Sequence, residues 1–132
     1  MQINAANSMT GNIIHQSAGL TLGAAGAGGY GEVQASAALN LFHQDALINN
    51  SKLVLNGPMS LGFNTDELTH SVNAIEWGGR ILVNGGHGDR LILDGPTTLT
   101  SDAVVYAGPQ YGLFRLIGDI TGNYSITKDQ SF

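Results

Sequence analysis

The sequence predicts an all-β protein, and specifically a parallel β-helix (solenoid) in which short strands wind into stacked coils. Many short segments show the apolar–polar alternation or the β-branched residues of strands, and Gly, Asn or Pro bounds most of them. Only 11% of the residues are charged, against roughly 25% in an average soluble domain. A segment also recurs later in the chain, which is typical of stacked structural units.

Helix signals are weak, because 19 glycines interrupt most long stretches of the 132 residues. Residues 32–47 have apolar side chains at helical spacing, yet Leu39 and Leu41 alternate as in a strand, and we favour strand or irregular structure there. We expect strands at residues 12–15, 20–22, 39–41, 52–55, 72–77, 80–83, 90–93, 97–100, 103–106, 113–117 and 124–127.

The most informative feature is a repeat. Residues 52–61 (KLVLNGPMSL) recur 38 positions later as residues 90–99 (RLILDGPTTL). In each copy two leucines point to one face of a strand, and Gly-Pro then turns the chain, because proline has no N–H for a ladder bond. The structural residues of the repeat are Leu53, Leu55, Gly57, Pro58 and Leu61 in the first copy and Leu91, Leu93, Gly95, Pro96 and Leu99 in the second.

Stacking such units about 4.8 Å apart would bury a continuous column of aliphatic side chains. A spacing of 38 residues corresponds to two coils of about 19 residues, so Leu53 and Leu91 are expected at equivalent levels of the column. We expect one domain over residues 1–132, less regular over residues 1–48, with a Gly-rich surface loop at 23–31. The alternative fold is a β-sandwich with two similar hairpins, which usually exposes more charge.

Composition excludes several classes of protein. The chain has no cysteine, which removes disulfide frameworks, thiol nucleophiles and Cys-based zinc sites. The net charge is −5 and the five basic residues are scattered, so we expect neither nucleic acid nor a polybasic membrane contact. No apolar run approaches the roughly 20 residues of a membrane helix, and the first residues lack a signal-peptide pattern. Any export signal is therefore expected outside this chain.

The Leu-x-Leu-x-Gly units followed by Asn/Gly turns resemble the autotransporter-associated β-strand repeat of bacterial passenger regions. Residues 118–128 (GDITGNYSITK) are similar to that family's Gly-x-Ile-Ser-Gly…Leu-x-Lys segment, although Asp129 stands where the family continues with Gly. The resemblance covers residues 49–132 best and residues 12–23 weakly. It implies a right-handed parallel β-helix, export through the outer membrane, display at the cell surface and a longer parent passenger. The family's repeat contains no catalytic residue, so none is carried over.

Two glycine-rich motifs are candidate ligand sites. Residues 26–31 match Gly-x-Gly-x-x-Gly, but the covering helices and the acidic residue of a dinucleotide fold are missing, so a loop is favoured. Residues 84–89 (NGGHGD) resemble a calcium-binding nonapeptide, but Asp89 comes one residue early and Arg90 occupies the acidic position. We predict a tight turn there, with no metal and no cofactor in the chain.

The remaining polar candidates have plainer interpretations as well. None of His15, His43, His70 and His87 pairs with another at metal-ligand spacing, so solvent-facing or turn positions are predicted. A glycosidase needs two carboxyl groups about 5 to 9.5 Å apart. The candidates are Asp66 and Glu67, expected in an exposed loop, and Asp89, Asp94 and Asp102 near the second repeat copy. We expect Trp77 and Tyr106 to pack in the interior or over a coil end.

The sequence therefore favours a non-catalytic structural or adhesive segment of an exported bacterial surface protein, located outside the cell or on its surface. Loops 23–31 and 63–70 would carry recognition of a host surface protein or glycan. The alternative function is a carbohydrate-processing or carbohydrate-binding β-helix of the polysaccharide lyase or tail-spike type. Because an open β-helix leaves unpaired backbone groups on its terminal coils, we expect end-to-end self-association or continuation into a longer protein.

Overall fold

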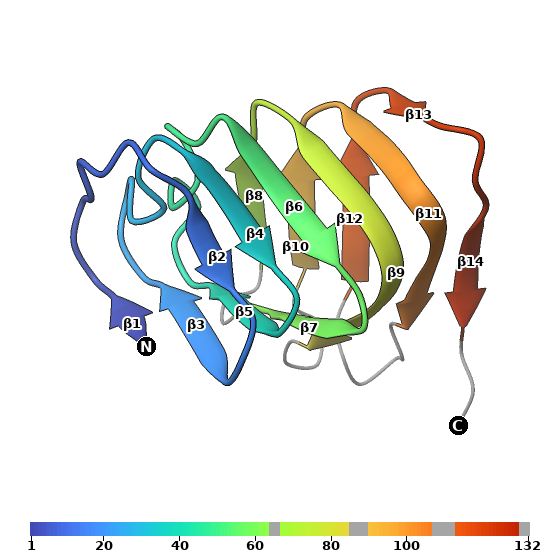
Figure 1. The fold of residues 1–132 in the computed structure, drawn as a ribbon, viewed down its shortest axis with the longest axis horizontal. Helices are drawn as coiled ribbons and strands as arrows, with labels where there is room; N and C mark the ends of the chain where they lie inside the picture. Colours follow the sequence, from blue (N-terminus) through green and yellow to red (C-terminus); the bar gives the residue numbers. More distant parts are fainter. Residues whose placement is uncertain (64–66, 85–89, 107–112, 130–132) are drawn as a thin grey trace.

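The computed structural model describes residues 1–63, 67–84, 90–106 and 113–129, which form a right-handed parallel β-helix of about five turns (Figure 1). Every strand pairing in these ranges is parallel. A sandwich of hairpins would need antiparallel pairs. The predicted fold class is therefore confirmed and the sandwich alternative is wrong.

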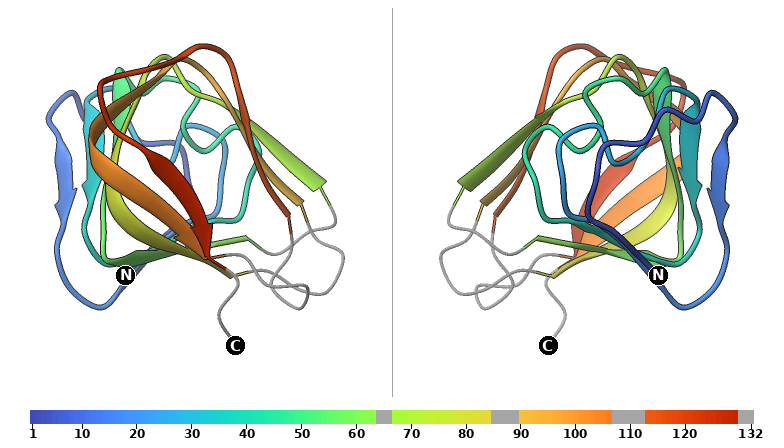
Figure 2. Two further views of the ribbon diagram at one scale, coloured as in Figure 1. Left: turned by 90° about the vertical axis from the view of Figure 1, so that its right-hand side faces the viewer. Right: turned by 90° about the vertical axis from the view of Figure 1, so that its left-hand side faces the viewer.

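The coil has three faces, and Figure 2 views it from its two ends. The first face consists of β2 (Ile13–His15), β4 (Glu32–Ala35), β6 (Lys52–Asn56), the first parts of β9 (Ile75–Asn84) and β11 (Thr97–Tyr106), and β13 (Ile120–Thr121). The second face consists of β1 (Gln2–Ile3), β3 (Gly19–Leu22), β5 (Ala38–Leu41), β7 (Met59–Gly62), the later parts of β9 and β11, and β14 (Ile126–Asp129). The third face consists of β8 (Glu67–Ser71), β10 (Arg90–Asp94) and β12 (Leu113–Ile117).

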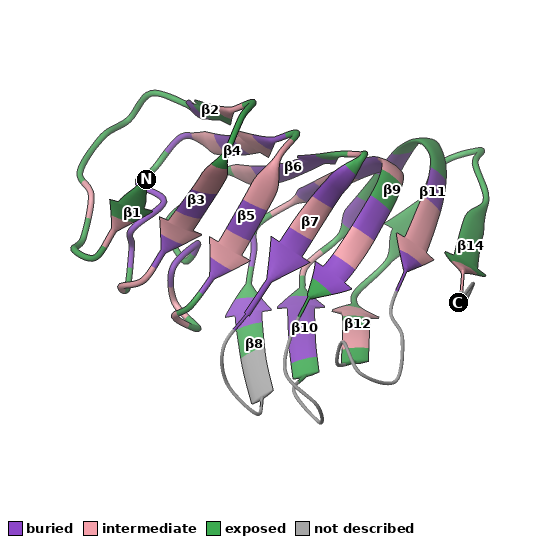
Figure 3. Ribbon diagram, turned by 90° about the horizontal axis from the view of Figure 1, so that it is seen from below, coloured by how far each residue is buried: buried purple, intermediate pink, exposed green. Residues whose placement is uncertain are grey.

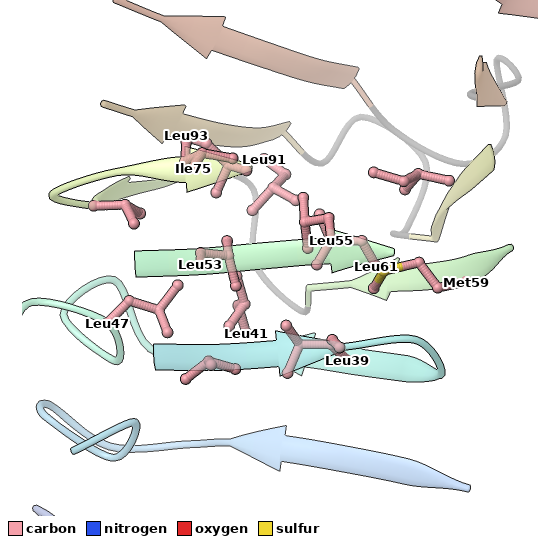
Figure 4. Packing of buried hydrophobic residues seen from close by; sticks show 14 of the residues in the cluster. Leu39, Leu41, Leu47, Leu53, Leu55, Met59, Leu61, Ile75, Leu91 and Leu93 are labelled. Carbon is pink, nitrogen blue, oxygen red and sulfur yellow. The ribbon is translucent and has the colours of Figure 1, made fainter. Parts of the chain in front are cut away.

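The core is built from columns of inward side chains, one residue from each coil. On the first face the column consists of Ile13, Val33, Leu53, Ile75, Thr97 and Ile120, each paired with the next. Strand residues alternate between inside and outside, so each strand adds its alternate residues to such columns. Figure 4 shows the leucines of β5, β6, β7 and β10 gathered in the interior, and those of β5 and β6 are at most 1% exposed.

The coil length changes along the chain, and this overturns one prediction. Gly19 pairs with Ala38, 19 residues later, as the repeat spacing predicts, but Leu53 pairs with Ile75, 22 residues later. Leu91 belongs to β10 on the third face, whereas Leu53 belongs to β6 on the first. The two leucines therefore do not occupy equivalent levels of one column, although both are fully buried. Each copy of the repeat forms two strands joined by a corner, and the two copies lie at two different corners of the coil.

The other residues of the repeat behave as its pattern predicts. The apolar positions Leu55, Leu61, Leu93 and Leu99 are between 0% and 5% exposed. Pro58 and Pro96 are exposed at the corners that follow β6 and β10. A Cβ on Gly57 would meet the backbone nitrogen and oxygen of Arg80, and one on Gly95 would meet the carbonyl oxygen of Val72. Only glycine lets neighbouring coils approach this closely at these corners.

Replacing Gly95 by alanine is therefore expected to destabilise the protein by about 1–3 kcal/mol, because the added methyl group must displace the Val72 backbone. Gly19→Ala is the matched control, since a Cβ there meets nothing within 4 Å. It should change stability by about 0.5 kcal/mol or less. Urea unfolding followed by circular dichroism measures both variants. Equal stability of the two would show that the corner is not close-packed.

In the first coils the third face is built from turns instead of a strand. The Gly26 N–H donates to the Asp45 carbonyl (2.8 Å), and the Gly28 N–H donates to the Ala46 carbonyl (3.0 Å). Ala27 between them is fully buried. The prediction that residues 23–31 leave the solenoid as a surface loop is therefore wrong, because the segment is wound into a coil.

Several strands differ from those expected. Residues 32–47 contain β4 and β5 and no helix, as favoured, but β4 itself was not among the expected strands, nor were β1, β7, β8 and β13. β9 begins at Ile75, three residues later than expected, and both β9 and β11 bend continuously across a corner (Figure 1). Of the expected loop 63–70, residues 64–66 lie outside the described ranges. Glu67 to His70 belong to β8, so the loop prediction is wrong for them.

Candidate functional site

The most distinctive surface is the end of the coil formed by β12, β13 and β14, here called the C-terminal opening. Each of these three strands pairs with a strand of the preceding coil. Among the described ranges no strand lies on their other side (Figure 2, left). Their outer edges therefore present backbone N–H and C=O groups that another strand could pair with.

Inward residues that are buried in earlier coils become accessible at the C-terminal opening. Phe114 and Leu116 continue the columns of Leu91 and Leu93 on the third face. The residues that line the resulting groove, of about 350 Å³, are Trp77, Val105, Phe114, Arg115, Leu116, Ile120 and Ile126. Ile120 is 46% exposed and Ile126 is 43% exposed. The groove is thus an uncovered part of the hydrophobic core.

Trp77 lies at the base of this groove. It is 1% exposed, and the Phe114 ring meets it edge to face with centroids 6.1 Å apart. Tyr106 is 9% exposed and carries the Arg80 guanidinium over its ring at 5.3 Å. The predicted interior packing is therefore confirmed for Trp77, whereas Tyr106 pairs with Leu82 at an outward position of β11 and lies under the Arg80 guanidinium.

Charged groups surround the apolar centre of the opening. Lys128 pairs in register with Val105, which itself pairs with Ile81, so Lys128 stands at an inward position of the last coil. Arg80 forms an ion pair with Asp129 at 3.5 Å, which links β14 to β9 across β11 on the second face. With Arg115 at its edge, the C-terminal opening is apolar in the middle and carries cations at its rim.

At the opposite end of the coil β1 and β2 also have outer edges that no described strand pairs with, but the inward column is more deeply buried there. Ile13 and Ile120 are the two terminal residues of the same inward column, yet Ile13 is 8% exposed against 46% for Ile120. Residues 4–12 pack along the next coil, since the Tyr30 N–H donates to the Met9 carbonyl at 2.9 Å. Figure 3 shows the burial of each strand along the coil. The two ends are therefore different surfaces.

His70 contradicts the prediction that the histidines face solvent or lie in turns. It pairs with Leu93 at an inward position of β8, it is fully buried, and neither ring nitrogen has a hydrogen-bond partner of normal geometry. Burial lowers the pKa of His70 to about 4, with His43 acting in the same direction and Asp45 and the Gln44 backbone opposing it. An uncharged imidazole therefore sits where the first third-face strand meets the preceding turns.

His15 and His43 are used in local hydrogen bonds. His15 is half-buried and donates a ring N–H to the Ala38 carbonyl at 2.9 Å, and His43 accepts the Asp45 N–H at 3.1 Å. His87 lies outside the described ranges, as do residues 85–89 of the calcium-like motif. Within the described part of the chain, no three His, Asp or Glu side chains are placed to hold a metal ion.

The carboxylates are used in local contacts. Lys52 lies between Glu76 at 2.7 Å and Glu32 at 3.5 Å on the outer side of the first face. The Gln34 side chain donates a hydrogen bond to the Glu32 carboxylate. This hydrogen bond is the largest cause of the lowered pKa of Glu32, and the Lys52 charge acts in the same direction. Asp102 accepts the Ser125 N–H and hydroxyl, both at 3.0 Å, which lowers its pKa. The Lys52 and Asp102 contacts join successive coils, and sequence reasoning missed them.

The remaining carboxylate candidates do not extend this set. Asp94 is exposed at the end of β10. Asp66 and Asp89 lie outside the described ranges, and for Glu67 the structure describes only the backbone. Asp94 and Asn56 occupy the same position in the two copies of the repeat, and both stand at the end of a strand.

Two buried or corner asparagines also went unnoticed in the sequence. The Asn50 side chain is fully buried and donates to the carbonyls of Gly28 (2.8 Å) and Gly31 (2.7 Å). The Asn73 side chain donates to the Asn50 carbonyl at 2.7 Å. The detectable signal is the spacing, because each asparagine stands two residues before a first-face strand, β6 or β9, and the two asparagines are 23 residues apart, about one coil length. They hold the corner backbone, which would otherwise be buried without partners.

The C-terminal opening is thus the candidate site, and its chemistry is that of an apolar surface bordered by strand edges.

The described residues contain no helix with the length and apolar character that a membrane crossing requires. No protein-family description, curated protein or solved structure matches the chain.

Proposed function

We propose that the chain is a non-catalytic structural and adhesive segment of an exported bacterial surface protein of the autotransporter type. The observation that carries the proposal is the right-handed parallel β-helix, whose columns of aliphatic side chains run through successive coils. Such a stack is stiff, because each coil is held by ladder hydrogen bonds and by the core of its neighbours. The segment would project or present other parts of its protein away from the membrane.

The motif that resembles the autotransporter repeat supports the same proposal. Gly118 and Gly122 flank β13 with φ angles of +107° and +118°. A Cβ on Gly118 would meet the Gly95 carbonyl oxygen at 2.8 Å, and one on Gly122 would meet the Leu99 carbonyl oxygen at 2.8 Å. The two glycines of the motif thus have a physical role, which is to turn the coil closely over the preceding one.

Recognition of a host protein or glycan would use the outward side chains of the coil. In loop 23–31, Gly26, Ala27 and Gly28 are buried between neighbouring coils, and the exposed residues are Ala25 and Tyr30. On the first face, Glu32, Lys52 and Glu76 form an outward row of alternating charge. A row of this kind favours a polar, weakly charged ligand over a strongly charged one.

Surface display can be tested in the bacterium that encodes the chain. Antibodies raised against the 132-residue protein should label intact cells, and external protease should remove the label, while a cytoplasmic marker stays unlabelled until the cells are permeabilised. Labelling that needs permeabilisation would refute the proposal. The carbohydrate alternative is tested separately by incubating the protein with a panel of polysaccharides. We expect no new reducing ends or unsaturated products, and cleavage would favour the alternative.

A further inference from the structure

We propose that the side-chain amide of Asn49 carries an N-linked sugar, with Asn123 as a second acceptor. Residues 49–51 (NNS) and 123–125 (NYS) both have the pattern Asn-x-Ser, at which N-glycosylation occurs when x is not proline. No other asparagine of the sequence has Ser or Thr two residues later. This modification rests on the proposed function, because N-linked sugars are found on surface segments of secreted proteins.

Asn49 is exposed in the turn that precedes β6. Its neighbour Asn50 is fully buried and donates to the Gly28 carbonyl of the preceding coil at 2.8 Å. The Asn50 carbonyl accepts the Asn73 side chain of the following coil at 2.7 Å. Coils therefore lie on both sides of this turn, and the exposure of Asn49 does not depend on either end of the stack.

The fold uses neither the Asn49 amide nor the Ser51 hydroxyl. In the described part of the chain no hydrogen bond involves either group, although the Ser51 N–H donates to the Gly31 carbonyl at 3.3 Å. Most other described asparagines use the side chain in a hydrogen bond, namely Asn4, Asn7, Asn12, Asn40, Asn50 and Asn73. A sugar on Asn49 would therefore break no contact within the coil.

Asn123 lies at the corner between β13 and β14 and is also exposed. The pairing of both strands with β11 places Asn123 over Thr100 of the preceding coil. Thr100 is exposed although the last coil lies over it, so this corner faces water in a covered coil too. The Ser125 hydroxyl, however, donates to Asp102 at 3.0 Å. Asn49 is therefore the acceptor whose tripeptide can be changed without loss of a structural contact.

The modification is a glycosyl transfer to an amide nitrogen by a transferase of the cell. Nδ2 of Asn49 forms a bond to the anomeric carbon of a sugar held on a diphosphate. The bond from that carbon to the phosphate oxygen breaks, and the diphosphate leaves with the bonding electron pair. One amide proton passes to a base of the transferase. The product adds neutral hydroxyl groups to a protein in which only 11% of the residues are charged, and such sugars increase solubility.

Peptide mass spectrometry of the complete chain, recovered from the bacterium that encodes it, tests the proposal. The Asn49 peptide should be heavier by a hexose, an N-acetylhexosamine or a larger glycan. Ser51→Ala should abolish this addition and keep the one at Asn123, whereas Ser51→Thr should keep both. Asn56 is the internal control, because it is exposed at the end of β6 but is followed by Gly-Pro. A single sugar would indicate a nucleotide-linked donor, and a preassembled oligosaccharide a lipid-linked one.

The folding of Ser51→Ala is checked by urea unfolding, and its midpoint should match that of the wild type expressed without the sugar. An unmodified Asn49 in the wild type, a sugar on Asn49 in Ser51→Ala, or a sugar on Asn56 would overturn the proposal. Antibody labelling of intact cells reports display with or without the sugar. Labelled cells whose Asn49 is unmodified would therefore refute this modification and leave the proposed function standing.

Discussion

Replacing Trp77 by alanine is expected to lower the free energy of unfolding by about 3–5 kcal/mol, the largest effect of any single substitution considered. Trp77 is 1% exposed in the column that contains Leu55 and Leu99, and it supports Phe114 at the C-terminal opening. The variant therefore loses the packing contacts of the indole ring. It also leaves a cavity in the core that the neighbouring strands β6 and β11 cannot fill. Urea unfolding monitored by circular dichroism measures the loss, since Trp77 is the only tryptophan.

Trp77→Phe is the matched control. It keeps an aromatic ring against Phe114 and removes the smaller ring of the indole with its N–H, which has no hydrogen-bond partner in the described structure. Its destabilisation should therefore be clearly smaller than that of Trp77→Ala. If the two variants were equally stable, Trp77 would not be packed as a core residue, and the assigned inward register of β9 would be wrong.

Acidification from pH 6.5 to pH 4 is expected to destabilise the protein by about 3 kcal/mol through His70 alone. Burial lowers the pKa of His70 from 6.5 to about 4 in the folded state. Above pH 6.5 the ring is neutral in both states, and there is no penalty. Between these values the unfolded chain binds a proton that the folded chain does not, so stability falls as the pH falls. Below pH 4 the loss is complete.

His70→Leu should remove this part of the pH dependence, because the replacement is apolar and fits an inward position beside Leu93. His43→Asn is the control, since His43 lies in the adjacent turn and its ring accepts only the Asp45 N–H. The free energy of unfolding, measured by urea titration at several pH values, should fall with acid in wild type and in His43→Asn. A His70→Leu profile that matches wild type would contradict the assignment.

The sequence predicts the fold class because its local signals agree with the global structure. Leu53 with Leu55, and Leu91 with Leu93, alternate as strand residues do, and all four are buried in the core. Gly57 and Gly95 mark corners, since only glycine permits the close approach of the next coil there. These features are local, and so they can be recognised without knowing which coil lies above which.

The parts that could not be predicted depend on contacts between coils. The repeat spacing of 38 residues reflects the reuse of one corner unit on two faces, and nothing local distinguishes the first face from the third. Gly26 and Gly28 are typical of a loop by composition, but hydrogen bonds to Asp45 and Ala46 wind their segment into the coil. His70 is buried because β8 places it inward. The C-terminal opening likewise arises from the end of the stack and has no sequence motif of its own.

The central claim is that neighbouring coils stack in parallel register, with later coils of 22 to 24 residues, and one disulfide experiment tests it most directly. Thr98 and Thr121 are paired outward residues whose hydroxyl oxygens lie 3.5 Å apart. In this cysteine-free chain, Thr98→Cys with Thr121→Cys should form an intramolecular disulfide on mild oxidation, because Cα atoms of paired strands lie within disulfide range. The pair Asp102→Cys with Thr121→Cys, 19 residues apart, should stay reduced. A disulfide in the second pair and none in the first would contradict the register on which the whole structure depends.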